Sequence, residues 1–178
     1  MEKRKTFSDE CKEMAIGYGL CQQWTEEWAD NSSYDEILHK YVKGIDFCLK
    51  HNIAPNDDYV KEFGYVTLHR NGIYYNESVD TVVNERFLSL SGHCTGTIDM
   101  NDGMPSEIYV RHTSEITLNV SNGSKVWLNL LDYTKVKIEC DRFSKVFVHN
   151  YGEGEVEGEG TGISYKERKG FFGECKSR

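Results

Sequence analysis

The chain has 178 residues, with 29 acidic and 21 basic side chains and a formal charge of −8. This length can bury one compact core, or one small domain with an appendage, but not two large domains. Binding to nucleic acid or to a membrane surface is disfavoured, because both need a basic surface and no uninterrupted basic run follows Lys3, Arg4 and Lys5.

The N-terminal residues are charged and polar, and no apolar stretch of seven or more residues follows them. We therefore expect neither a signal peptide nor a membrane-spanning helix, and we expect a cytoplasmic protein. Six cysteines lie without a Cys-x-x-Cys pair, which favours free or buried thiols over a disulfide scaffold or a zinc site. We expect no metal and no cofactor. The cysteines are Cys11, Cys21, Cys48, Cys94, Cys140 and Cys175.

Residues 1–65 are predicted to form a helical docking region. Apolar residues recur at helical spacing between Ser8 and Trp28, with a break expected near Gly19. The pattern predicts one interrupted helix at the start of the chain.

A second helix has the clearest signal. Ser33 and Glu36 make a capping box, and one apolar stripe follows, so a single helix is predicted as far as residue 51. Asp57 or Asp58 is expected to cap a third, short helix.

Residues 66–80 are predicted to be a linker with a β-hairpin. The dipeptide Asn71-Gly72 stands between apolar flanks, which is typical of a hairpin turn.

Residues 81–165 repeat a ten-residue pattern, a hydroxyl residue and a charge followed by alternating apolar and variable positions. Alternation with period two indicates strands with one buried face, and the constant step indicates stacked units. One block is expected to be shortened to eight residues at the turn of Asn101 to Gly103. The predicted fold class is α+β, a small N-terminal helical region followed by a short two-layered parallel β-solenoid, with an antiparallel β-sandwich as the alternative. The clearest blocks begin at Ser114, Ser124, Thr134 and Ser144.

The side chains between the apolar positions alternate between polar and aromatic from one block to the next. Two strands per coil of about 20 residues would put the aromatic ones in one row on one flank, whereas three strands per coil would scatter them. The expected aromatic row is Tyr109, Trp127 and Phe147, and the expected polar row is Asp99, Thr117, Lys137 and Glu157.

The aromatic flank is the predicted partner-binding surface. Aromatic rings beside Arg, Asn and His bury area at low entropic cost and still form hydrogen bonds, as binding surfaces do. The alternative is that the N-terminal helices pack on this flank and cover it. In the tail, residues 166–178, Phe171 and Phe172 are expected to anchor in this subunit or in a neighbour. The other predicted partner-binding residues are Tyr109, Arg111, Trp127, Asn129, Phe147 and His149.

No motif in the chain specifies a reaction. A Gly-rich phosphate loop, a G-x-S-x-G elbow and an H-E-x-x-H helix are all absent from the sequence. A possible nucleophile, base and orienting group could meet in stacked coils, from the set His93, Cys94, Asp99, Asp102, His112 and His149. We favour the simpler interpretation, polar residues of strands and turns, and predict no catalytic residue.

Three segments carry a resemblance: Cys48–His51, His69–Ile73 and Ile108–His112. They are similar to uncharacterised small proteins of gut-bacterial phages and mobile elements, which pair a helical N-terminus with repeats of the Ile-Tyr-Val-Arg-His type. The ladder also resembles, more loosely, bactofilin-type and phage-fibre solenoids, although its ten-residue step differs from the bactofilin pattern. The resemblance spans about Asp46 to Gly152. It implies a protein that polymerises or decorates, without catalytic residues, and a virion location if a phage encodes it.

Three functions follow as hypotheses. The first is a non-enzymatic structural or adaptor protein, which the resemblance would make a phage virion or mobile-element component, with a rigid solenoid face for a protein partner or for self-association. The second is a carbohydrate-binding module that uses the aromatic row as a stacking platform for a glycan. The third is a glycan-active β-helix enzyme, which needs a cleft with two convergent carboxylates or histidines.

Overall fold

The computed structural model describes residues 6–29 and 32–168, and it divides into two compact units between Ile53 and Ala54. Helices α5 and α6 thus group with the strands, whereas the predicted helical region and linker included them. Among the described residues, no helix has the length and apolar character needed to cross a membrane. The helices are α1 (Phe7–Gly17), α2 (Gln22–Glu26), α3 (Tyr34–Lys43), α4 (Ile45–Lys50), α5 (Asp57–Phe63) and α6 (Tyr65–Arg70).

The capping box predicted for α3 is confirmed. Glu36 N–H donates to Ser33 Oγ at 3.3 Å, and Ser33 N–H donates to Glu36 Oε2 at 2.6 Å. The helix does not run unbroken to residue 51, because Gly44 separates α3 from α4. A Cβ atom at Gly44 would lie 3.3 Å from the Trp24 ring, so the glycine leaves room for that ring. The apolar stripe is buried as expected, at Ile37, Leu38, Tyr41, Ile45, Cys48 and Leu49.

The expected hairpin at residues 66–80 is wrong. Helix α6 occupies its first third, and the strand that follows pairs in parallel with a later strand. The Asn-Gly dipeptide ends a helix here: Asn71 Nδ2 donates to Thr67 O, and Gly72 has a φ of 69° and donates its N–H to His69 O. An Asn-Gly pair suits both kinds of turn, since both need a residue with positive φ.

The cap of α5 also differs from the prediction. Asn56, and neither Asp57 nor Asp58, is the N-cap residue, and its Oδ1 accepts the backbone N–H groups of Asp58 and Tyr59. The two aspartates lie in the first turn of α5, where their charges are favourable beside the helix N-terminus.

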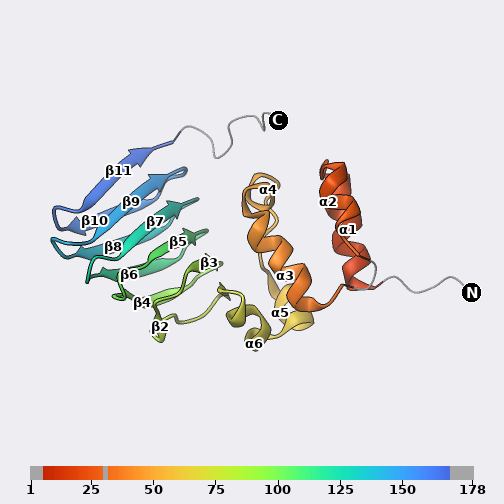
Figure 1. Cartoon of the computed structure of the whole chain (residues 1–178), viewed down its shortest axis with the longest axis horizontal. Coiled ribbons are helices and arrows are strands. Elements are labelled where there is room, and N and C mark those ends of the chain that lie inside the picture. Colours follow the sequence, from red (N-terminus) through yellow and green to blue (C-terminus); the bar gives the residue numbers. More distant parts are fainter. Residues whose placement is uncertain (1–5, 30–31, 169–178) are drawn as a thin grey trace, which may run out of the picture. The chain divides into compact units, whose positions relative to one another are not determined.

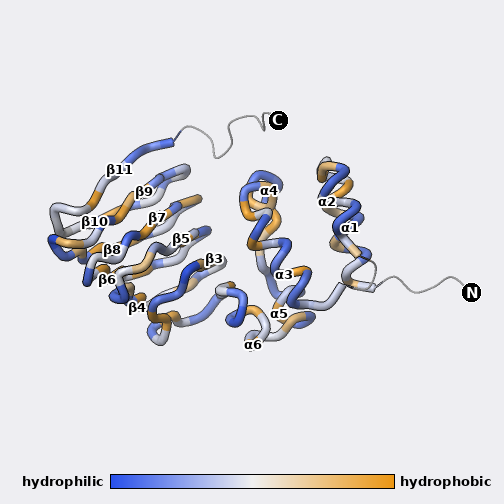
Figure 2. The backbone as a smooth tube through the Cα atoms, in the orientation of Figure 1, coloured by the Kyte–Doolittle hydropathy of each residue, from blue (hydrophilic) through white to orange (hydrophobic). Residues whose placement is uncertain are grey.

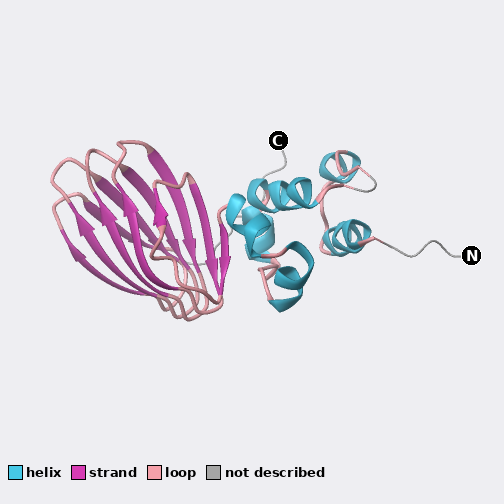
Figure 3. Ribbon diagram, turned by 90° about the horizontal axis from the view of Figure 1, so that it is seen from below, coloured by secondary structure: helices cyan, strands magenta, loops and turns pink. Residues whose placement is uncertain are grey.

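The strands form a two-layered parallel β-solenoid, which confirms the predicted fold class and the two strands per coil (Figures 1 and 3). The chain reverses at each corner, so the strands of the two sheets run in opposite directions. We call the sheets odd and even after their strand numbers. The odd sheet contains β1 (Ile73–Tyr75), β3 (Phe87–Ser91), β5 (Pro105–Val110), β7 (Lys125–Leu130), β9 (Lys145–Asn150) and β11 (Ile163–Glu167). The even sheet contains β2 (Val82–Val83), β4 (Thr95–Met100), β6 (Glu115–Val120), β8 (Lys135–Cys140) and β10 (Glu155–Glu159).

From β4 to β10, residues paired between neighbouring strands of a sheet are 20 positions apart in the sequence. No block is therefore shortened at Asn101 to Gly103. Ile108 lies beside Leu128, in the middle inward position of its strand, and the inward position before it is occupied by Ser106. The expected shortening to eight residues follows from taking Ile108 as the first inward residue of its strand, eight positions before Ile116. Because Ser106 is polar but buried, the hydrophobic pattern concealed one inward residue.

The core of the solenoid lies between the sheets, where each strand contributes up to three inward side chains. Apolar and polar residues therefore alternate along the strands (Figure 2). Stacked coils bury identical or similar residues above one another, as in Leu118 beside Ile138 and Leu128 beside Val148. Burying a residue of this size stabilises the fold by about 2 kcal/mol. The inward side chains of each coil pack only against those of adjacent coils, so each coil depends on its neighbours for stability.

Buried hydroxyl groups hold the corners between coils. Ser114 Oγ accepts the N–H of Cys94 at 3.1 Å, Ser124 Oγ accepts that of Gly103 at 3.0 Å, and Ser144 Oγ accepts that of Gly123 at 3.0 Å. Each bond joins a corner to the corner one coil earlier. The hydroxyl position of the sequence pattern therefore satisfies turn N–H groups that the strand ladders do not reach.

Helix α6 is joined to the first coil by a polar and aromatic cluster. The His69 ring stacks on Tyr74 at 4.5 Å between centroids, and His69 Nε2 lies 2.8 Å from Glu77 Oε2. Gly72 O accepts the N–H of Ser89 at 2.8 Å. These contacts place α6 in one structural unit with the strands.

Candidate interaction surface

Two aromatic rings lie together on the outer face of the odd sheet. Trp127 on β7 and Phe147 on β9 are register partners, and their rings stack with centroids 5.5 Å apart and an angle of 23° between the planes. The Trp127 side chain is 38% exposed and Phe147 is half-buried. A large exposed aromatic side chain on a rigid sheet is the kind of group that anchors binding partners.

Two lysines flank these rings. Lys125 and Lys145 are register partners two residues before Trp127 and Phe147, on the same outer face, and both are exposed. We call these four residues the Trp127 strip. Neither lysine is among the residues predicted to bind a partner, although the charge in the second position of each ten-residue block is the signal that could have found them.

The predicted row of three aromatic residues is wrong in its register. Glu107, and not Tyr109, pairs with Trp127, while Tyr109 lies in the next row beside Asn129. The Tyr109 ring approaches Phe87 instead, with centroids 5.9 Å apart, and its hydroxyl donates to Glu107 Oε1 at 2.8 Å. The cause is the buried, inward Ser106, which shifts the predicted register of β5 by two residues.

Three predicted partner-binding residues are buried. The exposed fraction is 4% for Tyr109, 3% for Arg111 and 5% for Asn129. Arg111 Nε lies 3.7 Å from Asp132 Oδ2. These three side chains are therefore covered and not exposed, and the exposed surface on this flank is smaller than the sequence predicted.

His149 lies beside the strip, in the row of Tyr109 and Asn129, and is half-buried. Its Nε2 is 3.4 Å from Arg168 Nη2. Burial, and then the positive charges of Arg168 and Lys166, lower the pKa of His149. Its imidazole is thus held neutral near physiological pH. Phe171 and Phe172, predicted as a tail anchor, lie outside the described residues.

The outer face of the even sheet is polar, as predicted, although its rows are also displaced. Thr117 and Lys137 are register partners and Glu157 continues their row, but Asp99 lies in the next row, where it accepts a hydrogen bond from Asn119 Nδ2 at 2.8 Å. This face carries both signs of charge and no large aromatic group, so it differs in kind from the odd face.

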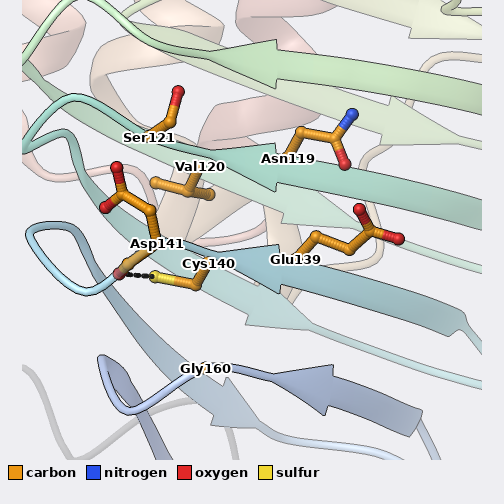
Figure 4. Close-up of a pocket in the computed structure, with 7 residues that line it drawn as sticks. All are labelled: Asn119, Val120, Ser121, Glu139, Cys140, Asp141 and Gly160. Carbon is orange, nitrogen blue, oxygen red and sulfur yellow. Dashed lines mark hydrogen bonds between the residues drawn. The ribbon is translucent and has the colours of Figure 1, made fainter.

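A shallow cavity of about 480 Å³ lies at the end of β6 and β8 (Figure 4). Its two carboxylates, Glu139 and Asp141, point away from each other. Glu139 binds Lys137 Nζ at 2.8 Å, and Asp141 accepts the N–H of Ser144 at 2.8 Å. Hydrogen bonding by Ser144 lowers the pKa of Asp141. Both carboxylates thus already bind groups of the protein itself. The cavity is lined by Asn119, Val120, Ser121, Glu139, Cys140, Asp141 and Gly160.

The residues considered for nucleophilic chemistry do not converge. His93, Cys94 and His112 lie at the corners that follow odd strands, Asp102 lies at an opposite corner, and His149 lies on the outer odd face. Burial raises the pKa of the Cys94 thiol. Within residues 6–29 and 32–168, no three His, Cys, Asp or Glu side chains gather as a metal site.

No protein-family model and no solved structure matches the chain. Among curated proteins, the chain is similar to a hydroxamate-type ferrichrome siderophore peptide synthetase of Schizosaccharomyces pombe, with 26% identity over 151 residues. The match covers 79% of this chain but only 3% of the synthetase. This similarity shows no family.

Proposed function

We propose that the chain is a non-enzymatic adaptor whose β-solenoid presents a rigid face to a protein partner. The observation that carries this proposal is the exposed Trp127 ring, stacked on Phe147 on the outer face of a continuous parallel sheet. Side chains held on a hydrogen-bonded sheet lose little conformational entropy on binding, so an aromatic pair there is an efficient anchor.

The strip favours a partner that offers an apolar pocket rimmed by acidic side chains. Lys125 and Lys145 are exposed beside the rings, and they place positive charge on one local surface of a chain with a net charge of −8. Rim charges of this kind mainly steer association and set specificity, while the buried ring supplies most of the affinity. The resemblance to phage and mobile-element proteins makes a virion or another mobile-element assembly the proposed setting.

A carbohydrate-binding module is the second candidate, and the same ring favours it. A fully buried Trp127 would have ended this hypothesis, but the ring is accessible. Sugar rings stack on exposed tryptophan faces through their C–H groups, and polar neighbours bind the hydroxyls. The odd face, however, offers lysines beside the rings, where a neutral glycan gains less than an acidic protein surface does.

The proposal is tested by photo-crosslinking in the native host. Benzoylphenylalanine in place of Phe147 keeps an aromatic ring in the strip, and the same group in place of Tyr133 is the control, because Tyr133 is an exposed aromatic residue at a corner. We expect a discrete protein adduct from position 147, no such adduct from position 133, and loss of the adduct when Trp127→Ala or Lys145→Glu is added.

The alternatives give different results. Adducts of equal yield from both positions, or adducts that persist with Trp127→Ala, would contradict a binding role for the strip. Glycan-array binding that is lost with Trp127→Ala, without any protein adduct, would replace the adaptor with the carbohydrate-binding module.

A further inference from the structure

The C-terminal end of the solenoid is an open pair of strand edges. In the part of the chain that the structure describes, β10 pairs with β8 and β11 pairs with β9, and each has no strand on its other side. Both strands are five residues long, whereas the edge strands at the other end, β1 and β2, have three and two residues. Long unpaired edges are templates for pairing with another chain.

The core is also incompletely covered at this end. Tyr165 occupies the register position of the fully buried Val148, yet its side chain is 48% exposed. Val156 and Ile163 pack against the core but are only half-buried. A further pair of strands would bury these three apolar side chains as the preceding coils bury theirs.

The outward-facing charges at the two strand edges are of opposite sign. The outward residues of β10 include Glu155 and Glu157, and those of β11 include Lys166, with Arg168 following directly in the same alternation. A copy of the chain related by a two-fold axis would bring antiparallel strands together, because the strands of the two sheets, to which β10 and β11 belong, run in opposite directions (Figure 3). It could lay β10 on the partner's β10, glutamate against glutamate, or β10 on the partner's β11, acid against base.

We propose that two copies of this chain join head to head through these edges, each β10 pairing antiparallel with the partner's β11. This register puts Glu157 opposite Lys166 and Glu155 opposite Arg168, on both sides of the two-fold axis. Cross-strand pairs of opposite charge stabilise a sheet, and like charges directly opposite destabilise it. The contact uses the same patch on both copies, so it closes as a dimer and does not propagate into a fibre.

The experiment is sedimentation equilibrium over a concentration series, with full-length protein and charge-swap variants. We expect a monomer–dimer equilibrium that Glu157→Lys or Lys166→Glu weakens about tenfold or more, because each change puts two like-charged pairs into the dimer. The double swap Glu157→Lys with Lys166→Glu restores opposite charges and should restore dimerisation. Glu115→Lys is the matched control: Glu115 has the same outward orientation in β6, away from the edge, and should leave the equilibrium unchanged.

Circular dichroism of each variant establishes that it is folded before its mass is compared. A wild-type monomer at all concentrations would overturn the proposal, and so would a dimer that ignores both single swaps. A monomer that dimerises only when residues 169–178 are deleted would overturn it as well, because the tail, and not a second copy, would then cover the edge.

Discussion

The backbone and the ring of His112 both have structural roles at the corner between β5 and β6. The residue has a φ of 59°, its N–H donates to Asp132 Oδ2 at 3.0 Å, and its Nδ1 accepts the N–H of Gly92 at 2.8 Å. Burial, and then the charge of Arg111, lower the pKa of His112. The folded state therefore holds the neutral ring whose Nδ1 lone pair the hydrogen bond requires.

This lowered pKa predicts a loss of stability in mild acid. Between the pKa of His112 in the folded state and its unfolded value of about 6.5, the unfolded chain binds more protons, so the free energy of unfolding falls as the pH falls below about 6.5. We expect His112→Asn to reduce this slope, because asparagine tolerates positive φ and can accept the Gly92 hydrogen bond without titrating. Urea unfolding at pH 7.5, 6.5 and 5.5 measures it.

The exposed His39, changed to asparagine, is the control and should leave the slope as it is. Part of the slope should remain in His112→Asn, since the pKa of His149 is also lowered. Asp80, Asp102 and Asp141 have lowered pKa values and act in a separate window, where stability is lost as the pH falls below about 4. A slope between pH 7.5 and 5.5 that is unchanged by His112→Asn would contradict the role given to this ring.

Two glycines with positive φ allow the cost of backbone strain to be measured apart from the cost of a steric collision. At Gly72, φ is 69° and a Cβ atom would collide with the carbonyl oxygen of Phe87, whereas at Gly123 φ is 81° and a Cβ atom would meet open space. Gly123→Ala should cost about 1–2 kcal/mol of stability for the left-handed conformation alone. Gly72→Ala should cost clearly more, because α6 must also move away from β3. Chemical denaturation of both variants tests this, and equal losses would contradict it.

At the scale of the element, the strands are held together by their corners as well as by their ladders. Ser124 is fully buried and accepts the N–H of Gly103 one coil earlier. Ser124→Ala would leave that N–H without its partner, so we expect a loss of about 1–3 kcal/mol, measured by urea denaturation. Ser164→Ala, at an exposed position of β11, should change stability by less than about 0.5 kcal/mol. Similar effects of the two substitutions would show that the corner hydroxyl is not structural.

The sequence predicted the strands whose first inward residue is apolar, such as Ile116, Val126 and Val136, and failed at β5, where that residue is polar. From Ser114 onward the pattern is regular. The predicted strands, their ten-residue spacing and the side of the sheet on which each residue lies agree with the structure. In β5 the inward Ser106 looks like a surface residue, so the register shifted by two and moved Tyr109 into the wrong row. The end of α6 was mispredicted for a similar reason, because Asn71-Gly72 is compatible with both a hairpin turn and a helix end. Local patterns do not distinguish these cases, since tertiary contacts decide them.

The candidate surface was predicted in part. Trp127 and Phe147 lie on one outer face, because alternation along a strand fixes the side on which a residue lies. The burial of Tyr109, Arg111 and Asn129 was not predictable, because it depends on what covers each row of the sheet and not on the strand itself. The charged position of each block is visible in the sequence, but only the register shows that Lys125 and Lys145 lie side by side next to the rings.

At the scale of the whole molecule, the division between Ile53 and Ala54 predicts two units of unequal independence. Residues 54–178 contain both sheets, their core and helices α5 and α6, so this fragment should fold alone and keep the β-sheet circular dichroism spectrum of the full chain. Residues 1–53 contain short helices with a small shared core, and this fragment should be only marginally stable. Thermal unfolding of both fragments tests this. A fragment 54–178 that is unfolded would contradict the boundary.

The alternation of the two sheets also restricts how such a chain can change length. A deletion of 20 residues, such as 115–134, removes one whole coil and leaves every later strand in its own sheet. A deletion of ten, such as 115–124, removes one strand and one corner, so each later strand is transferred to the opposite sheet. Trp127 and Phe147 would then stand on the side that now carries Thr117, and Lys137 would stand on the other. Gain or loss of repeats in this protein therefore conserves its surfaces only in even numbers of blocks, and an odd number exchanges its two faces.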